Sequence, residues 1–251
     1  MDQGAISIGP AFAVVLVALV GIAAGAAAIG RLGMSRATVT ASLRAVVQLA
    51  VVSLLITAVL RSWWATAGFV ALMLTVAVAT SARRISTLRL GWPVAAPIAA
   101  GALPVGAGIV AAGTTPLQTV AVLPIAGILI GGAMTATSLA GRRALDELHN
   151  RHGEYEAALA LGFLPRDAAL EVIRPTAGRA LVPALDQTRT VGLVTLPGAF
   201  VGVLLGGGTA VQAGATQVLV LVALLAVEAV AVAVTVEMVA GDVLRAREPT
   251  S

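Results

Sequence analysis

The chain has 251 residues, of which 59% are hydrophobic, 11% charged and 3% aromatic, and its mean hydropathy is +0.99. Because a water-soluble domain of this length carries about 25% charged residues, the composition excludes soluble enzymes, DNA-binding modules and disordered proteins. A membrane-spanning helix takes about 20 residues, so the sequence predicts an all-α fold: a polytopic bundle of about seven transmembrane helices that forms one domain, residues 1–251.

Charged and turn-forming residues divide the chain into these expected spans. The uncharged stretches 90–141 and 190–227 are each too long for one helix, and the Gly/Thr/Pro run 113–116 and the glycines 206–208 should break them. Prolines within the fourth, fifth and sixth expected spans should bend or interrupt the helices. The expected spans lie near residues 8–30, 41–60, 63–82, 92–112, 117–140, 190–206 and 216–240.

The arginines predict the orientation of these spans. Arginines follow the first, third and fifth expected spans and the last one, whereas the connections after the fourth and sixth spans hold none. Positive residues accumulate on the cytoplasmic side of a membrane, so we expect the N-terminus outside and the C-terminus inside. The same distribution argues against a nucleic-acid partner and predicts a multi-pass protein of the cytoplasmic membrane.

Two residue types are missing from the sequence. There is no Cys, which excludes disulfides, thiolate metal sites and Cys nucleophiles. There is no Lys either, since all 16 basic residues are Arg, and this excludes the phosphate loop that ends in Gly-Lys-Ser/Thr. We therefore expect no cofactor on this chain, and any ATP and Mg²⁺ to be bound by another subunit.

Residues 142–189 form the one sizeable polar segment. It holds seven arginines and seven acidic residues, a neutral balance that fits protein docking better than lipid or nucleic-acid binding. A first helix is expected over 154–161, with Gly162 just past its end. Pro165 suits the first turn of a second helix, which Pro175 should end.

The spacing of small residues in this segment resembles the EAA loop of ABC-transporter permeases, which presents a short cytoplasmic coupling helix to a groove on the ATPase subunit. Alanines permit close approach, the glycine makes the turn, and the glutamate can pair with a basic residue of the partner. The alternative is an amphipathic helix on the membrane surface. The matching residues are Glu156, Ala157, Ala158, Gly162, Val172 and Pro175.

A wider resemblance covers most of the chain. The segments RAVVQL at 44–49, PIAG at 124–127, GAM at 132–134, LALG at 159–162, RALVP at 179–183 and TVGLVTLPG at 190–198 resemble those of the FetB-like permeases. These are membrane subunits of a bacterial iron-export ABC transporter, together with plant aluminium-tolerance relatives. The resemblance implies a permease that exports iron or a related metal-linked solute and is energised by a separate ATPase chain. The sequence departs from the family at two places. Residues 131–132 are Gly-Gly where family members often have Gly-Asn, and residues 199–201 are Ala-Phe-Val where they often have a Met pair followed by Ser or Thr.

Several residues within the spans are candidates for the transport pathway or its gate. Arg44 and Gln48 lie four residues apart on one face of the second span. Arg44 either extends to the lipid headgroups or pairs with Glu237 and closes a cytoplasmic gate. The other candidates are Pro124, Gly127, Met134, Thr195, Pro197, Gly198 and Glu228.

Glu228 lies near the middle of the last span, where an acidic side chain costs about 2.5–3.5 kcal/mol on insertion scales. It should therefore face the bundle interior or water. One interpretation is a cation or proton site, which would make the protein an ion-coupled secondary transporter. The other is a neutral hydrogen-bonded acid, or one paired with Arg. No metal site is assigned, because His149 and His152 lack a third ligand nearby.

We expect no catalytic residues, because the sequence offers neither a catalytic acid pair nor a nucleophile with its base. The working hypothesis is a homodimer of permeases that binds two copies of an ATPase. Closure of the ATPases would push on the loop 154–175, and the spans kinked at Pro124 and Pro197 would then switch access to a central pathway.

Overall fold

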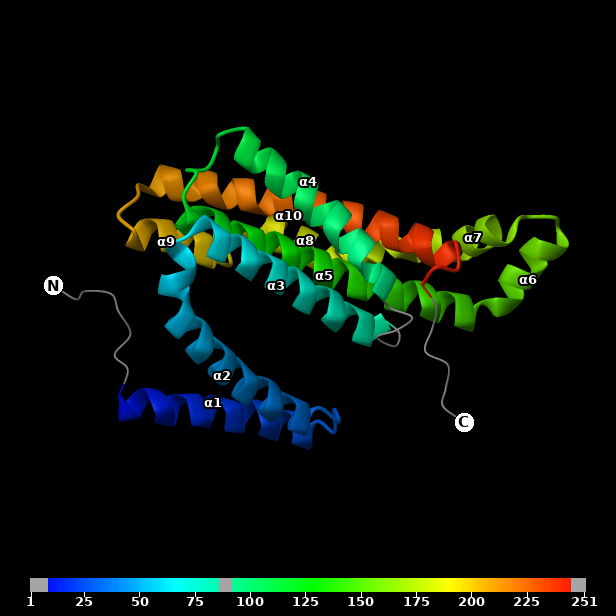
Figure 1. Cartoon of the computed structure of the whole chain (residues 1–251). Coiled ribbons are helices and arrows are strands. Elements are labelled where there is room, and N and C mark those ends of the chain that lie inside the picture. The colour runs from blue at the N-terminus through cyan, green and yellow to red at the C-terminus, as the bar shows by residue number, and fades with distance from the viewer. Residues whose placement is uncertain (1–8, 86–91, 245–251) are drawn as a thin grey trace. The chain divides into compact units, whose positions relative to one another are not determined.

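The computed structural model describes residues 9–85 and 92–244 (Figure 1). These residues are helical, apart from short connections and an isolated bridge between Val191 and Thr195, which confirms the all-α prediction for this part of the chain. Two short 3₁₀ turns, Trp92–Val94 and Gly178–Leu181, precede α4 and α8. The α-helices are α1 Pro10–Ile29, α2 Ser35–Leu60, α3 Trp63–Ile85, α4 Ala95–Ala111, α5 Thr119–Asn150, α6 His152–Ala160, α7 Pro165–Ala177, α8 Val182–Thr190, α9 Gly198–Leu205 and α10 Ala210–Ala240.

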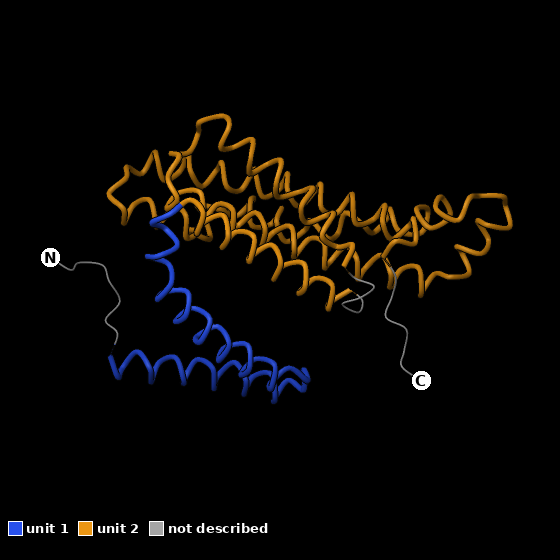
Figure 2. The backbone as a smooth tube through the Cα atoms, viewed as in Figure 1, with its two compact units in different colours: residues 1–62 blue, residues 63–251 orange. Residues whose placement is uncertain are grey.

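The chain forms two compact units, residues 1–62 and 63–251 (Figure 2). The first contains α1 and α2, which pack as a helical hairpin around a tight connection. Ala27 is the only buried residue of these two helices. Their apolar side chains therefore face outward, as expected of helices surrounded by lipid or by another helical surface. The second unit contains α3 to α10 and holds the rest of the buried core.

Six helical stretches among the described residues are long and apolar enough to cross a membrane. They confirm a polytopic membrane bundle, but the expected sixth span, 190–206, is not one long helix. Instead α8 ends at Thr190, and α9 begins only at Gly198 and has 8 residues. Gly192 has a φ of +81°, and Pro197 lacks the backbone N–H that a helix interior requires, so the backbone is irregular between them. The six stretches are α1, α2, α3, Trp92–Ala111, α5 and α10.

The contacts within the second unit fix the directions of its helices. Gly141, near the end of α5, packs against Ile85 at the end of α3, and Gly132 of α5 packs against Leu224 of α10. Figure 1 shows α5 and α10 side by side, running the same way. The chain must therefore return along the bundle between them, and α8, the irregular residues 191–197 and α9 make this return pass.

Small residues allow the central helices to approach closely. A Cβ atom at Gly101 of α4 would lie 2.6 Å from the carbonyl oxygen of Val227 on α10. Alanines such as Ala133 and Ala231 are fully buried in the same core. Helices in lipid associate mainly through such van der Waals contacts, so these residues hold α4, α5 and α10 together.

Two helix ends differ from the sequence predictions. The fifth span was expected to end near residue 140, but α5 continues to Asn150, because no helix-breaking residue follows Gly141. Pro175 was expected to end the second loop helix, but it lies inside α7, which ends at Ala177. The proline removes one backbone hydrogen bond, and three residues later the helix tightens into the 3₁₀ turn. The breaks at 113–116 and 206–208 are confirmed.

Candidate functional site

The polar segment after α5 folds into the two short helices α6 and α7. The turn after α6 is a Schellman motif: the N–H of Phe163 bonds to the carbonyl of Ala158 at 3.2 Å, and that of Gly162 bonds to Leu159 at 2.9 Å. Gly162 has a φ of +92°, a conformation that favours glycine. Pro165 occupies the first turn of α7. Both sequence predictions for this turn are confirmed.

The two helices differ in burial. α6 contains no buried residue, and the turn after it exposes Leu161 to 80% and Leu164 to 69%. α7 instead buries one face, which includes Leu170, Val172 and Ile173, against the ends of α5 and α10. The loop thus consists of an exposed helix held by an anchored one, and Figure 1 shows α6 at the far end of α5.

The residues of the predicted EAA motif are distributed over both helices. Glu156 is exposed on α6, and its carboxylate lies 3.3 Å from Nε2 of His152. Ala157 is exposed and Ala158 partly so, whereas Val172 is only 2% exposed and packs inside. The motif residues on α6 therefore offer a surface to a partner, whereas Val172 anchors α7 and Pro175 is exposed near its end.

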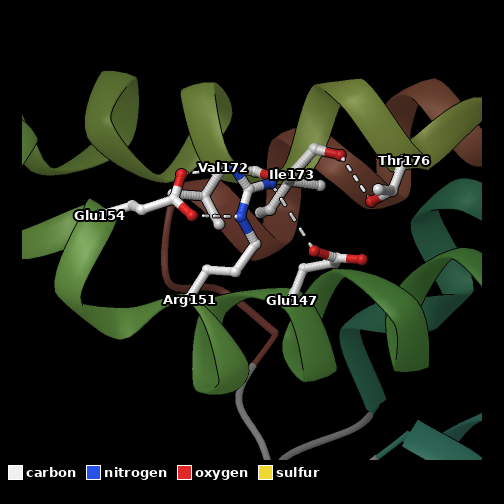
Figure 3. Close-up of polar contacts among 6 residues, drawn as sticks. All are labelled: Glu147, Arg151, Glu154, Val172, Ile173 and Thr176. Carbon is white, nitrogen blue, oxygen red and sulfur yellow. Dashed lines mark hydrogen bonds and ion pairs between the residues drawn. The ribbon is translucent and has the colours of Figure 1, made fainter.

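Arg151 connects three helices at the point where α5 gives way to α6 (Figure 3). Its Nε donates to Oε1 of Glu154 at 2.8 Å, and its Nη2 binds the other oxygen of the same carboxylate. Its Nη1 donates to the backbone carbonyl of Val172 at 3.2 Å and lies 3.7 Å from Oε2 of Glu147. The hydrogen bond from Arg151 lowers the pKa of the Glu154 carboxyl, and the same bond raises the pKa of Arg151. We call these four residues the Arg151 junction.

A second ion-pair group joins α7 to the end of α10. Oε2 of Glu237 accepts from Nη2 of Arg166 at 2.5 Å, and its Oε1 accepts from Nη2 of Arg174 at 3.5 Å. We call these three residues the Glu237 junction. Sequence reasoning considered Glu237 only as a partner of Arg44, which belongs to the first unit, and that pairing stays a prediction. The eight-residue spacing of the two arginines, about two helical turns, could have indicated a common partner.

Six of the predicted pathway residues lie on α5 and around the start of α9. Gly127 packs against the Met73 side chain of α3, and Met134 is partly buried against the core. Thr195 lies in the irregular part of the return pass, and Gly198 begins α9. Pro124 lies inside α5, Pro197 precedes α9, and Arg44 and Gln48 are exposed on α2 in the first unit.

Glu228 is 8% exposed on α10, and Oε1 would lie 3.1 Å from a Cβ atom at Gly132 of α5. Gly132 thus provides the space into which the carboxyl group fits. Within the described residues of the second unit, no hydrogen bond or ion pair of this carboxyl group is present. The prediction that Glu228 faces the bundle interior is confirmed by its burial.

Gln217 is a polar residue of the bundle that sequence reasoning missed. It is 4% exposed on α10, and its Oε1 accepts the backbone N–H of Phe200 in the first turn of α9 at 3.3 Å. The first N–H groups of a helix have no partner within it, so this amide satisfies one of them inside the bundle. An amide within a mainly apolar span was the available signal.

The candidate metal ligands are not gathered at one place. His152 pairs with Glu156 and stacks on Tyr155 with ring centroids 5.9 Å apart. In the part of the chain that the structure describes, no three His, Asp or Glu side chains lie together as metal ligands.

Comparisons with known proteins identify the family. The family model described as "Uncharacterised protein family (UPF0014)" matches residues 11–244. The chain is 32% identical over 195 residues to "UPF0014 membrane protein STAR2" of Oryza sativa subsp. japonica, which covers 76% of this chain and 68% of the relative. It is 35% identical over 124 residues to "Probable iron export permease protein FetB" of Escherichia coli, which covers 47% of this chain and 48% of that protein.

A third relative is "Protein ALUMINUM SENSITIVE 3" of Arabidopsis thaliana, 39% identical over 99 residues, or 39% of this chain and 36% of the relative. No solved structure matches the chain. These relatives confirm the resemblance to FetB-like permeases and their plant counterparts. Since the family model covers nearly all of the sequence and six stretches can cross a membrane, this chain is a multi-pass membrane protein of the UPF0014 family.

Proposed function

We propose that the chain is the membrane-spanning permease subunit of an ABC transporter and that a separate ATPase subunit docks on α6. The observation that carries the proposal is the exposed helix α6, which bears Glu156 and Ala157 and is anchored to the bundle through α7. A partner can reach α6 without disturbing the packed core. ATP and Mg²⁺ would be bound by the partner, because this chain has no Lys to complete a phosphate loop.

The positions of the arginines support a cytoplasmic location for α6. Arg83 and Arg84 end α3, Arg142 and Arg143 lie toward the end of α5, and the Arg151 junction follows. The end of α3 packs against Gly141, the residue before Arg142, so these positive charges gather toward one end of the second unit. Positive residues favour the cytoplasmic side, and the C-terminus then lies inside and the N-terminus outside. Arg89, Arg245 and Arg247 of the predicted set lie outside the described residues.

The transported solute and the direction of transport come from the relatives. FetB is named an iron export permease, so we propose export of iron or a related metal-linked solute. A homodimer of permeases with two ATPase subunits would enclose the pathway, because the described residues of one chain provide six long helical stretches and the broken return pass. Native mass spectrometry of the purified complex tests this composition, and a lone permease with full transport activity would contradict it.

Docking on α6 is tested by charge reversal of Glu156 in chains co-expressed with the ATPase subunit. We expect Glu156→Arg to reduce both ATPase co-purification and solute-stimulated ATP hydrolysis. The matched control is Glu171→Arg, since Glu171 is an exposed acid on α7 rather than α6. Equal retention of the ATPase by both variants would refute docking on α6. In lipid vesicles, stimulation by another solute but not by ferrous or ferric iron would refute the iron assignment.

A second candidate function, ion-coupled secondary transport, is favoured by the buried and unpaired carboxyl of Glu228 described above. Such a transporter would use Glu228 as its proton or cation site. Glu228→Gln should then abolish transport, whereas Glu156→Arg should leave it intact. The ABC proposal predicts that the Glu156 variant fails and that transport in vesicles requires ATP.

A further inference from the structure

A movement of α6 can move other helices only if specific contacts hold α6 to the bundle. It buries no residue, and the turn that leads from it to α7 is exposed. Tyr155 is the α6 side chain that packs against the core, and it does so only partly. Contact with apolar residues alone therefore holds α6 weakly, and polar contacts must fix its position.

Arg151 lies where the direction of the chain changes. Its φ of −113° and ψ of 32° are outside the helical region, and it is both the last cap of α5 and the first cap of α6. Its N–H bonds to the carbonyl of Glu147 at 2.9 Å, and its own carbonyl accepts the N–H of Glu154 at 3.0 Å. The backbone of one residue thus ends one helix and starts the next.

The side chain of Arg151 adds a contact that crosses to α7. The planar guanidinium binds both oxygens of Glu154, the geometry in which arginine recognises a carboxylate best. Its remaining donor reaches the carbonyl of Val172, 21 residues along the chain. Val172 lies in the second half of α7, and its side chain is buried in the core. Figure 3 shows the guanidinium between the two helices.

We propose that Arg151 is a positioning residue that fixes α6 relative to α5 and α7, so that a displacement of α6 moves α7 with it. This inference rests on the proposed function, because a docked ATPase subunit is what would displace α6. The Glu237 junction then connects α7 to α10, since Arg166 and Arg174 of α7 bind the carboxylate of Glu237 at the end of α10. A push on α6 is delivered through α7 to the helix that carries Glu228.

The test compares Arg151→Gln with Arg142→Gln in the complete permease–ATPase complex. Arg142 is a matched control on α5, because its described side-chain hydrogen bond goes to the carbonyl of Ser138 in its own helix. Two readouts are measured: solute transported per ATP hydrolysed, and the distance between spin labels at Asp146→Cys on α5 and Leu161→Cys at the end of α6. This chain has no Cys, so within it only these two positions are labelled.

We expect Arg151→Gln to broaden the distance distribution and to lower transport per ATP by about 2- to 30-fold, the range found for residues that carry coupling between sites. ATPase binding should be retained, because the docking surface of α6 is unchanged. Arg142→Gln should leave both readouts as in the wild type. Identical distances and coupling ratios for the two variants would overturn the proposal.

Two further variants separate the ion pair from the backbone bond. Arg151→Lys keeps the charge but loses the bidentate geometry, so we expect an intermediate result. The exchange of Arg151→Glu with Glu154→Arg restores an ion pair, but a carboxylate at 151 cannot donate to the carbonyl of Val172. Coupling should stay low in this double variant, and full recovery would overturn the role of the Val172 bond. If the wild-type chain bound no ATPase, the proposed function would fail, while the label distances would still test how Arg151 positions α6.

Discussion

The contact between Gly101 of α4 and Val227 of α10 allows a quantitative test of the helix packing. A Cβ atom at Gly101 would lie 2.6 Å from the carbonyl oxygen of Val227, so the helices must separate by ~0.8 Å to reach the 3.4 Å of an ordinary contact. That oxygen belongs to the backbone of a buried helix and cannot rotate away. Overpacking of this kind costs about 1–3 kcal/mol, while alanine gains up to about 1 kcal/mol over glycine inside a helix.

Gly101→Ala should therefore destabilise the protein by up to about 2 kcal/mol, the cost of overpacking less the gain in helix propensity. Gly108→Ala is the matched control, because no atom lies within 4 Å of a Cβ at that position of the same helix, and it should not destabilise. The assay is thermal unfolding of both variants in detergent, where 1 kcal/mol corresponds to about 2–4 °C for a unit of this size. Equal melting temperatures for the two variants would refute the close approach of α4 and α10.

Three further predictions concern the loop and the return pass. Gly162→Ala should cost about 1–2 kcal/mol because of its positive φ and reduce ATPase co-purification, whereas Gly153→Ala on α6, which has open space around it, should not. Gln217→Leu leaves the partly buried N–H of Phe200 on α9 without its acceptor and should lower the free energy of unfolding by about 0.5–1.5 kcal/mol, measured by the same thermal assay with Gln217→Asn for comparison. Because its hydrogen bond lowers the pKa of Glu154, the Arg151 junction should persist as the pH falls past the usual glutamate value of about 4.3 and be lost only below it. If the distribution of label distances on α6 broadened already at about pH 5, the predicted lowering of the Glu154 pKa would be contradicted.

The parts of the fold that depend on local chemistry could be predicted from the sequence. Glycine at a positive φ and proline at a first turn act on their own backbone, so Gly162 and Pro165 marked the turn between α6 and α7 correctly. The breaks before α5 and before α10 follow the same logic. Apolar composition likewise identified the six long stretches, since the cost of placing polar groups in lipid depends mainly on residue type.

The return pass could not be predicted in this way. Residues 190–206 are apolar enough to suggest a span, but hydropathy does not register the backbone conformation of Gly192 or the N–H missing from Pro197. Irregular backbone inside a bundle survives where neighbouring helices satisfy its polar groups. Gln217 of α10 does so for the start of α9, and that partner becomes visible only once both helices are placed.

The two junctions explain how the loop formed by α6 and α7 is connected to both α5 and α10. Arg151 reaches Val172, 21 residues away, and Arg166 reaches Glu237, 71 residues away. Both contacts exist because α5 and α10 run in the same direction, so that their ends meet at one end of the bundle and α7 packs against both. A force applied to α7 therefore acts on α5 and α10 together. If α5 and α10 ran in opposite directions, the same loop could contact only one of these ends, and the carboxylate of Glu237 would be a bundle length away from the arginines that bind it.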